Sequence, residues 1–301
     1  MAASGIAKFS DELSAAAEHA EQSVVTVFAR RRLPSSGISW RKGVVVTAAH
    51  TIQREEELSV LIAGNKKVSA RLAGRDPGTD LAVLKLDDLE MQVAEFGDPA
   101  QLKLANLVLA LGRTRGGNLV ASAGIIGGLG GELRTWRGGR IDQSIRLDLE
   151  LYPGFSGGPL VGVDGKILGV NTSGLARGRA ITIPVATVNR TVDELLAKGY
   201  IARPYLGIAM QPIRIPENAR GKLKSTGGLM VLHVEMGSPA DKAGIVLGDV
   251  IVELQGRPAL DLGYIRGILA SSKIGDNIRT TILRAQQPKE LSISLAERTV
   301  N

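Results

Sequence analysis

Three residues of this chain have the types that together activate a hydroxyl group for attack on a carbonyl carbon. Ser156 lies in the stretch GFSGGP, His50 ends the apolar run VVVTAAH, and Asp80 follows a Pro-Gly turn in RDPGTDLAVLKL. A serine nucleophile needs a base that takes its proton and a third group that orients the base. His50 is the candidate base and Asp80 the candidate orienting acid. A half-buried structural histidine and a turn aspartate bound to its own backbone remain the alternatives for these two residues.

The histidine count narrows the choice of base. The chain contains three histidines. His19 lies in a polar N-terminal segment typical of a surface helix, and His233 lies in an apolar strand of the second half, where a structural role is favoured. His50 is the histidine whose context, the end of a strand, best suits catalysis.

The glycines around Ser156 indicate how its loop is built. Gly154 and Gly157 accept backbone dihedral angles that other residues resist. Such a bend can turn the N–H groups of Gly154 and Ser156 toward one point, where they would form an oxyanion hole. The same string also fits the G-x-S-x-G elbow of α/β-hydrolases. That elbow requires a helix directly after the serine, and the following Gly157-Gly158-Pro159 disfavours one.

Composition limits the function classes. The 301 residues suit two domains, and a high glycine count of 37 with many short Val/Ile/Leu runs favours β structure. The chain has no cysteine, and its sequence shows no metal-ligand cluster or cofactor motif, so no cofactor or metal is expected. The net charge of +7 is mostly dispersed, without an aromatic-interleaved basic motif, so nucleic-acid binding is a distant alternative.

Targeting signals are also absent from the sequence as written. No apolar run is long enough to span a membrane, and the first twenty residues contain Asp11, Glu12 and Glu18 in place of an apolar core. We therefore expect no membrane span and no signal peptide. This pattern fits a cytoplasmic protein, or a periplasmic one whose export signal has been removed.

The elements that must position these residues are mostly strands. We expect a helical segment at 1–22 with its helix over 10–21, a β-rich domain at 23–198, a linker at 199–204 and a second β-rich domain with two helices at 205–298. The first domain ends in a helix from about Thr187 to Lys198. Its predicted strands are 24–28, 43–49, 58–63, 81–86, 107–112, 124–129, 145–151, 166–172 and 180–185.

The order His50, Asp80, Ser156 is the chymotrypsin order, and at this point a family resemblance is specific. The motifs TAAH, DPGTDLAVLKL and PGFSGGPLV resemble those of the HtrA (Deg) branch of chymotrypsin-like serine proteases. RPYLGIAM (203–210) and GSPADKAGIVLGDVIVELQG (237–256) resemble the PDZ domain that follows in that family. The resemblance implies a mainly β chain, with a chymotrypsin-like double β-barrel followed by a PDZ domain.

The resemblance also implies roles for individual residues. His50, Asp80 and Ser156 would form the triad, and Gly154 and Ser156 would hold the oxyanion. The substrate pocket would be lined by Leu151, Ser173, Gly174 and Leu175. The carboxylate-binding loop of the PDZ domain would be Tyr205, Leu206, Gly207 and Ile208.

The implied partners are unfolded or exposed polypeptides at the protease site, peptide C-termini at the PDZ domain and two further copies in a homotrimer. Leu151 favours a small or medium apolar residue before the scissile bond. A pocket that contains Glu150, which would favour a basic residue, violates strand alternation.

One residue departs from the family pattern. Phe155 stands where the family normally has Asn, directly before Ser156. Because the oxyanion donors are backbone groups, this change need not abolish catalysis, but it could alter the loop or cover the site. The leading hypothesis is a serine endopeptidase. The alternative is a catalytically silent PDZ-containing scaffold or chaperone that binds unfolded polypeptides.

Overall fold

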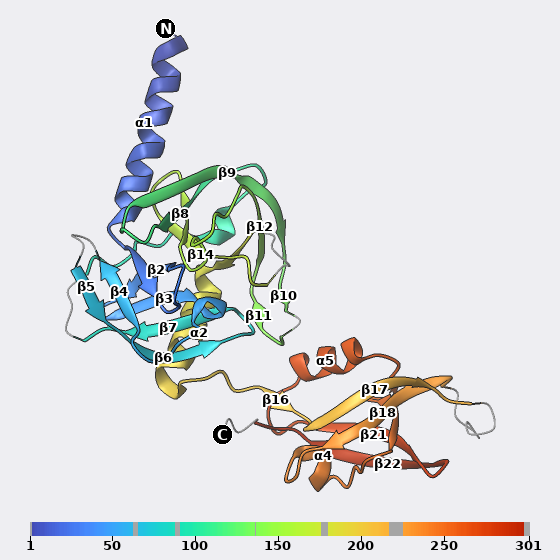
Figure 1. Ribbon diagram of the computed structural model, residues 1–301. Coiled ribbons are helices and arrows are strands. Elements are labelled where there is room, and N and C mark those ends of the chain that lie inside the picture. Colours follow the sequence, from blue (N-terminus) through green and yellow to red (C-terminus); the bar gives the residue numbers. More distant parts are fainter. Residues whose placement is uncertain are drawn as a thin grey trace. The chain divides into compact units, whose positions relative to one another are not determined.

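The computed structural model describes residues 2–62, 66–87, 91–135, 137–175, 180–216 and 225–297. The chain folds into two compact units, Met1–Ile201 and Ala202–Asn301 (Figure 1). The division falls inside the segment 199–204 that the sequence indicates as a linker. The expected end of the second domain, residue 298, lies outside the described residues.

The first seven strands form one antiparallel sheet with the order β5-β4-β1-β2-β3-β7-β6. The strand β2 was not predicted, because its sequence SSGISWR lacks the alternation of apolar and polar residues. Six of its seven residues are buried, so both faces are covered and no alternation is required. The strands are β1 (Val24–Phe28), β2 (Ser35–Arg41), β3 (Val44–Ala48), β4 (Ser59–Ile62), β5 (Lys66–Ser69), β6 (Arg71–Asp76) and β7 (Leu81–Lys85).

Six later strands close into a barrel with the order β12-β15-β14-β13-β8-β9. A small hairpin, β10 (Leu133–Arg134) and β11 (Arg140–Ile141), leaves this barrel between β9 and β12. The barrel strands are β8 (Leu107–Arg113), β9 (Leu119–Gly130), β12 (Ser144–Asp148), β13 (Pro159–Gly162), β14 (Ile167–Thr172) and β15 (Ile181–Pro184). The expectation of a mainly β chain with a barrel-type first domain is confirmed.

One hydrophobic core joins the sheet to the barrel. It contains Trp40 and Ile38 from β2 and Val170 from β14, each fully or almost fully buried. Trp40 donates its indole N–H to Asn189 Oδ1 at 2.8 Å, so the one polar atom of this buried ring is satisfied. The candidate catalytic residues lie next to three strands: His50 follows β3, Asp80 precedes β7 and Ser156 precedes β13.

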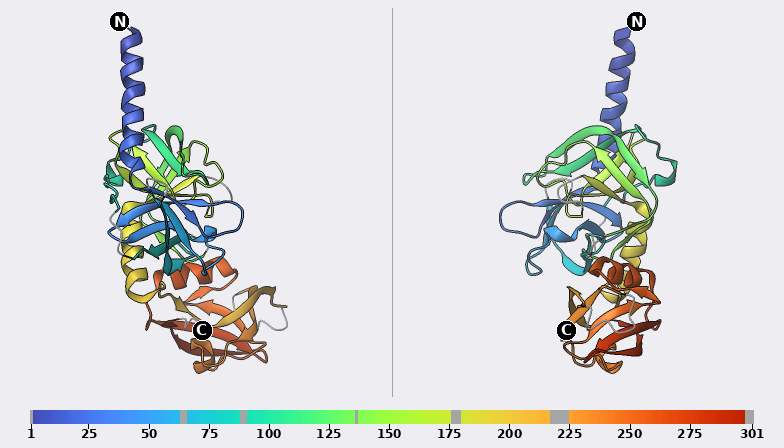
Figure 2. Two further views of the ribbon diagram at one scale, coloured as in Figure 1. Left: turned by 60° about the vertical axis from the view of Figure 1, so that its left-hand side comes forward. Right: turned by 90° about the vertical axis from the view of Figure 1, so that its right-hand side faces the viewer.

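Two α-helices flank the first unit (Figures 1 and 2). Helix α1 (Ala2–Glu21) begins well before the predicted start at residue 10. The added stretch contains Ala7 and Lys8, which are good helix formers, and also Gly5, which is a poor one. Its second half packs on the core through Ala16 and Ala20, while Ile6 and Phe9 in its first half are exposed. Helix α2 (Val185–Lys198) ends at Gly199, whose φ of +83° gives the left-handed C-cap.

The second unit is a six-stranded sheet with β17 at one edge and β22 at the other. The predicted cap of the short helix α4 (Pro239–Lys242) is confirmed, because Ser238 accepts a hydrogen bond from the N–H of Asp241. The longer helix α5 is Leu262–Ser271. The strands are β16 (Pro204–Tyr205), β17 (Ile208–Arg214), β18 (Gly227–Val234), β19 (Val250–Leu254), β20 (Arg257–Pro258), β21 (Asn277–Arg284), β22 (Gln287–Ser294) and β23 (Ala296–Glu297).

Candidate active site

His50 and Asp80 are brought together by the pairing of β3 with β7. In this antiparallel pair Ala48 lies opposite Leu81, so the residues just beyond each partner lie side by side. His50 lies on a 3₁₀ turn (Ala49–Thr51) that follows β3, and Asp80 directly precedes β7. His50 Nδ1 lies 2.7 Å from Asp80 Oδ2, and the N–H of His50 donates to Oδ1 at 2.8 Å. Because a carboxylate only accepts, Nδ1 carries the proton and Nε2 keeps its lone pair as an acceptor, without a partner among the described residues.

Asp80 is held in a fixed orientation. Its exposed fraction is 1%, and its φ of +57° lies in the left-handed region that favours glycine. The hydroxyl of Thr172 donates to Oδ2, and the carbonyl of Asp80 accepts from the N–H of Ala49 at 2.9 Å. A non-glycine residue at positive φ persists only where its surroundings fix it. These contacts therefore support an orienting role for the carboxylate.

The turn before Asp80 is buttressed from two sides. Asp76 accepts from the N–H of Gly78 at 2.9 Å and from the hydroxyl of Thr79 at 2.8 Å. From the β10–β11 hairpin, Thr135 Oγ1 donates to the carbonyl of Gly78 at 2.8 Å. The hairpin therefore contacts the segment that presents the carboxylate.

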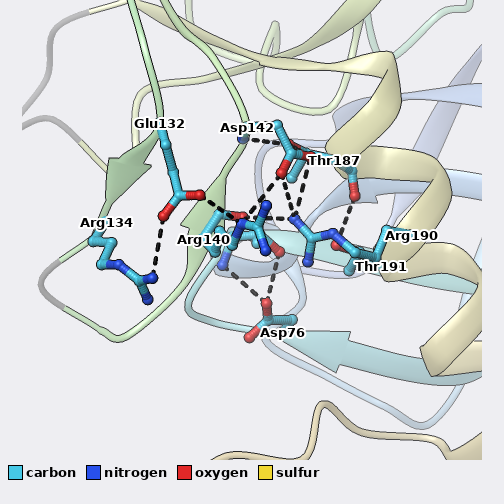
Figure 3. A network of polar contacts seen from close by, with 9 residues as sticks. Asp76, Glu132, Arg134, Arg140, Asp142, Thr187, Arg190 and Thr191 are labelled. Atoms are coloured by element: carbon cyan, nitrogen blue, oxygen red, sulfur yellow. Dashed lines mark hydrogen bonds and ion pairs between the residues drawn. The ribbon is translucent and has the colours of Figure 1, made fainter. Parts of the chain in front are cut away.

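That hairpin is itself fixed against α2 by a polar network (Figure 3). Asp142 accepts from Thr187 Oγ1 at 2.8 Å and lies 3.3 Å from Arg190 Nη2. Arg140 Nε lies 2.8 Å from Glu132 Oε2 and 3.4 Å from Asp142 Oδ1. Sequence reasoning missed this network, because its members are far apart in the chain and their charges resemble an ordinary solvated surface.

Ser156 lies in a tight loop that precedes β13. The N–H of Phe155 donates to Tyr152 O at 3.0 Å, and the N–H of Gly158 donates to Phe155 O at 2.9 Å. Gly154 and Gly157 have φ values of +101° and +90°, as their predicted role requires. At Gly157 a Cβ atom would also lie 2.2 Å from the carbonyl oxygen of Ser36, so glycine is required there on steric grounds as well.

The hydroxyl of Ser156 contacts a second hydroxyl. Ser156 Oγ lies 3.2 Å from Ser173 Oγ, and among the described residues its hydrogen bond is with Ser173 rather than with His50. Ser173 is followed by Gly174, whose ideal Cβ position lies 2.6 Å from Asp80 Oδ2 and 2.7 Å from His50 Nδ1. The segment Thr172–Gly174 thus touches Ser156 on one side and the His50–Asp80 pair on the other.

The candidate oxyanion donors are unengaged in the described part of the chain. The backbone N–H groups of Gly154 and Ser156 have no backbone acceptor there, whereas Gly154 O accepts from Ser36 N at 2.9 Å and from Ser36 Oγ at 2.8 Å. Ser36 was not predicted as a site residue. The only available signal was its place in a Ser-Gly stretch upstream of His50.

Phe155 does not lie over the site. Its exposed fraction is 3%, and a Cβ added at Gly112 would lie 2.6 Å from its Cδ1 atom, so the ring lies against β8. Tyr152 meets the ring edge-on at a centroid distance of 5.4 Å. The concern that Phe155 covers the nucleophile is therefore not supported by its position, which is interior.

The predicted pocket residues occupy different environments. Leu151 is partly exposed, Asp148 and Glu150 are exposed and Leu149 is partly buried. The strand β12 ends at Asp148, short of the predicted end at residue 151, so strand alternation does not extend to Glu150 and Leu151. Ser173 and Gly174 lie beside the catalytic candidates. Leu175 is buried in the core shared by the sheet and the barrel, so it anchors the segment that contains Ser173 and Gly174 to that core.

The second unit presents a loop with free donors. Leu206 O accepts from the N–H of Ala240 at 3.0 Å and Gly207 O accepts from the N–H of Glu235 at 2.8 Å. Within the described residues, the N–H groups of Leu206 and Gly207 have no backbone acceptor. Gly207 has a φ of +78°, and Ile208 begins the edge strand β17. Tyr205 lies outside this turn, paired with Ala296 in a two-stranded ribbon.

The described residues contain neither a metal-holding cluster nor a helix suited to span a membrane. They contain no group of three or more His, Asp or Glu side chains placed to hold a metal ion. Among the helices of those residues, none combines the length and the apolar character needed to cross a bilayer.

Both units of the chain are similar to known protein families. The family model described as a trypsin-like peptidase domain matches residues 35–170, and the model of the PDZ domain matches residues 204–295. The structure of the serine endoprotease from Yersinia pestis aligns with a TM-score of 0.69 at 27% identity, and covers 95% of this chain and 98% of that one.

Two curated relatives are similar over most of this chain. It is 34% identical to the serine protease Do-like HtrA of Lactobacillus helveticus, over 84% of this chain and 65% of that protein. It is 34% identical to the protein of the same name from Bacillus subtilis (strain 168), over 85% of this chain and 61% of that protein. The chain thus spans less than two thirds of the length of these relatives. The two matched domains, their order in the chain and the names of the relatives all indicate the same family. The chain therefore belongs to the HtrA family of trypsin-like serine proteases that carry a PDZ domain.

Proposed function

We propose that the chain is a serine endopeptidase that cleaves unfolded or exposed polypeptide through an acyl-enzyme. The observation that carries this proposal is the contact of His50 with the buried Asp80, at an Nδ1–Oδ2 distance of 2.7 Å, beside a loop that also touches Ser156. Nε2 of His50 is left as an acceptor, as a general base requires. Family membership adds the reaction type.

The proposed mechanism begins with a rotation of Ser156. A change of its χ1 to another staggered rotamer releases Ser173 and brings Oγ to His50 Nε2. His50 takes the hydroxyl proton as Ser156 attacks the scissile carbonyl, and Asp80 stabilises the imidazolium that forms. The N–H groups of Gly154 and Ser156 hold the oxyanion. His50 then returns the proton to the leaving amine, and a water molecule hydrolyses the acyl-enzyme by the same steps.

We propose that the second unit binds peptide C-termini. Among the described strands, β17 lies at the edge of its sheet and pairs on one side only, and α5 lies against β16 and β17. An extended peptide can add to such an edge, with its carboxylate on the N–H groups of Leu206 and Gly207. This binding would tether substrates or regulate the protease unit.

We propose a homotrimer as the assembled state. Its support is the family membership and the exposed apolar residues Ile6 and Phe9 on α1, which are 73% and 48% exposed. Exposed large apolar residues on one helix favour contact with another chain.

The test of the proposed function is a casein digest followed on a gel with the wild-type chain and with Ser156→Ala. We expect cleavage by the wild type and none by the variant, at equal thermal stability. Equal cleavage by both would refute the assignment of Ser156. Labelling with a serine-reactive phosphonate separates the alternative: a chain whose Ser156 remains unlabelled in every oligomeric state is the silent scaffold.

A further inference from the structure

A buried serine on β2 contacts the loop that carries Ser156. Ser36 is fully buried, with an exposed fraction of 0%. Its hydroxyl donates to Gly154 O at 2.8 Å, and its N–H donates to Gly154 O at 2.9 Å and to Ser156 O at 3.3 Å. The hydroxyl also accepts from the N–H of Arg113 at 2.9 Å. Ser36 therefore ties two carbonyl groups of the loop to the ends of β2 and β8.

These contacts fix the Gly154–Phe155 and Ser156–Gly157 peptide planes, which adjoin the planes that contain the N–H groups of Gly154 and Ser156. In a trans peptide the C=O and the N–H point in opposite directions. The plane between Gly154 and Phe155 is held at both ends, by Ser36 on Gly154 O and by Tyr152 O on the N–H of Phe155 at 3.0 Å. The Phe155–Ser156 plane is held by Gly158, whose N–H donates to Phe155 O at 2.9 Å. The N–H of Ser156 therefore points away from Gly158.

The ring of Phe155 provides a second attachment of the same loop. It is buried against Gly112 on β8, where an added Cβ would lie 2.6 Å from Phe155 Cδ1 and 3.0 Å from Ser36 Oγ. Glycine at 112 leaves the space that both groups occupy. The loop is thus attached through a polar contact at Gly154 and an apolar contact at the adjoining residue.

We propose that Ser36 is a positioning residue that keeps the N–H groups of Gly154 and Ser156 directed at the substrate carbonyl. Phe155 and Gly112 complete this support through packing. The inference rests on the proposed function, in which these two N–H groups hold the oxyanion. It also gives a role to Phe155, since an apolar side chain at this position anchors the loop in the interior.

The experiment compares Ser36→Ala with the matched control Ser23→Ala. Ser23 is also buried, and its hydroxyl donates to a backbone carbonyl, Ala20 O at 2.9 Å, which is remote in sequence from the loop. Both variants lose one buried hydroxyl-to-carbonyl bond. Ser36→Ala also loses the bond from the N–H of Arg113, so its melting temperature should fall further than that of Ser23→Ala. Gly112→Ala is the second test variant, because its methyl group displaces the ring of Phe155.

Two readouts are taken at a temperature at which every variant is folded. Removal of one oxyanion donor costs about 10²–10³-fold in kcat, so loss of a support should cost about 10- to 100-fold with KM changed less than about threefold. Amide hydrogen exchange should become faster at residues 154–158 in Ser36→Ala and Gly112→Ala, and stay unchanged in Ser23→Ala.

The outcomes separate the inference from the proposed function. A wild-type chain that cleaves no peptide and whose Ser156 is unlabelled overturns both. An active wild type with Ser36→Ala as active as Ser23→Ala overturns the inference alone. Unchanged exchange at residues 154–158 in Ser36→Ala overturns it as well, whatever the activity. Faster exchange together with the loss in kcat supports it.

Discussion

The most informative single substitution in the site is Gly174→Ala. The ideal Cβ position at Gly174 lies 2.6 Å from Asp80 Oδ2 and 2.7 Å from His50 Nδ1, both below the 3.0 Å that real Cβ atoms respect. The two atoms it would meet are the partners of the 2.7 Å hydrogen bond between the imidazole and the carboxylate. Its backbone φ is in a region open to alanine, so the obstacle is the contact and not the backbone. The methyl group must therefore separate His50 from Asp80 or move the segment that contains Gly174.

The expected cost follows from the role of the carboxylate. In a serine protease, loss of the correct imidazole tautomer lowers kcat by about 10⁴-fold with little other change. At 1.36 kcal/mol for each factor of ten, a loss of about 10³–10⁴ corresponds to about 4–5 kcal/mol of transition-state stabilisation. The lower end applies if the segment moves aside and keeps part of the hydrogen bond.

The assay is kcat and KM on a fluorogenic peptide, with melting temperature measured in parallel. Gly116→Ala is the matched control, because no heavy atom lies within 4 Å of its ideal Cβ position. We expect the control to retain full activity. The reasoning would be refuted by a Gly174→Ala variant with more than a tenth of wild-type kcat, provided that Ser156→Ala is inactive.

Two further predictions concern the second unit. Burial alone would raise the pKa of Asp249, but the hydrogen bonds from Arg284 and the N–H of Val246, with the charges of Arg284 and Lys289, outweigh it and lower the pKa. The pair therefore stabilises the fold above the ordinary carboxyl pKa, and this contribution disappears as pH falls through the lowered value. Calorimetry from pH 7 to pH 3 should show a lower melting temperature for Arg284→Gln, by about 4–8 °C for each kcal/mol lost, with a difference that shrinks on acidification; a constant difference would contradict the electrostatic cause. In Gly207→Ala, the Cβ would lie 2.2 Å from Ser238 Cβ at a φ of +78°, so we expect at least about tenfold weaker binding of a peptide with a free C-terminus by fluorescence anisotropy. The same peptide with an amidated C-terminus is the control, and unchanged affinity for the free acid would argue against the carboxylate loop.

Much of the fold could be predicted because the relevant signals are local. The run VVTVF became β1 with the predicted bounds, and the Ser-Pro start and Gly stop of α4 appear as predicted. The α2 helix ends at the predicted Gly199. Where the pattern depends on burial from both sides, as in β2, prediction failed, because the alternation that identifies a half-buried strand is absent there.

The residues of the candidate site could also be predicted from the sequence, whereas their contacts could not. Residue type, spacing and order were sufficient to select His50, Asp80 and Ser156, because few chemistries use these residues in this order. Proximity of the imidazole to the carboxylate follows only from the register of β3 on β7. The contacts of Ser156 with Ser173, and of Gly174 with the His50–Asp80 pair, depend on segments that the chain brings together from different strands.

Phe155 shows most clearly what only the tertiary structure decided. In the sequence it is a bulky residue beside the nucleophile, and its side chain could turn toward solvent, over the site or into the interior. The space left by Gly112 and the bonds from Ser36 to Gly154 direct it inward, and these three residues come from three separate parts of the chain. The sequence by itself determined the chemistry that the site could perform, because residue types carry it. Which way each side chain points was decided by packing between distant segments, because the free volume that accepts a side chain exists only once those segments meet.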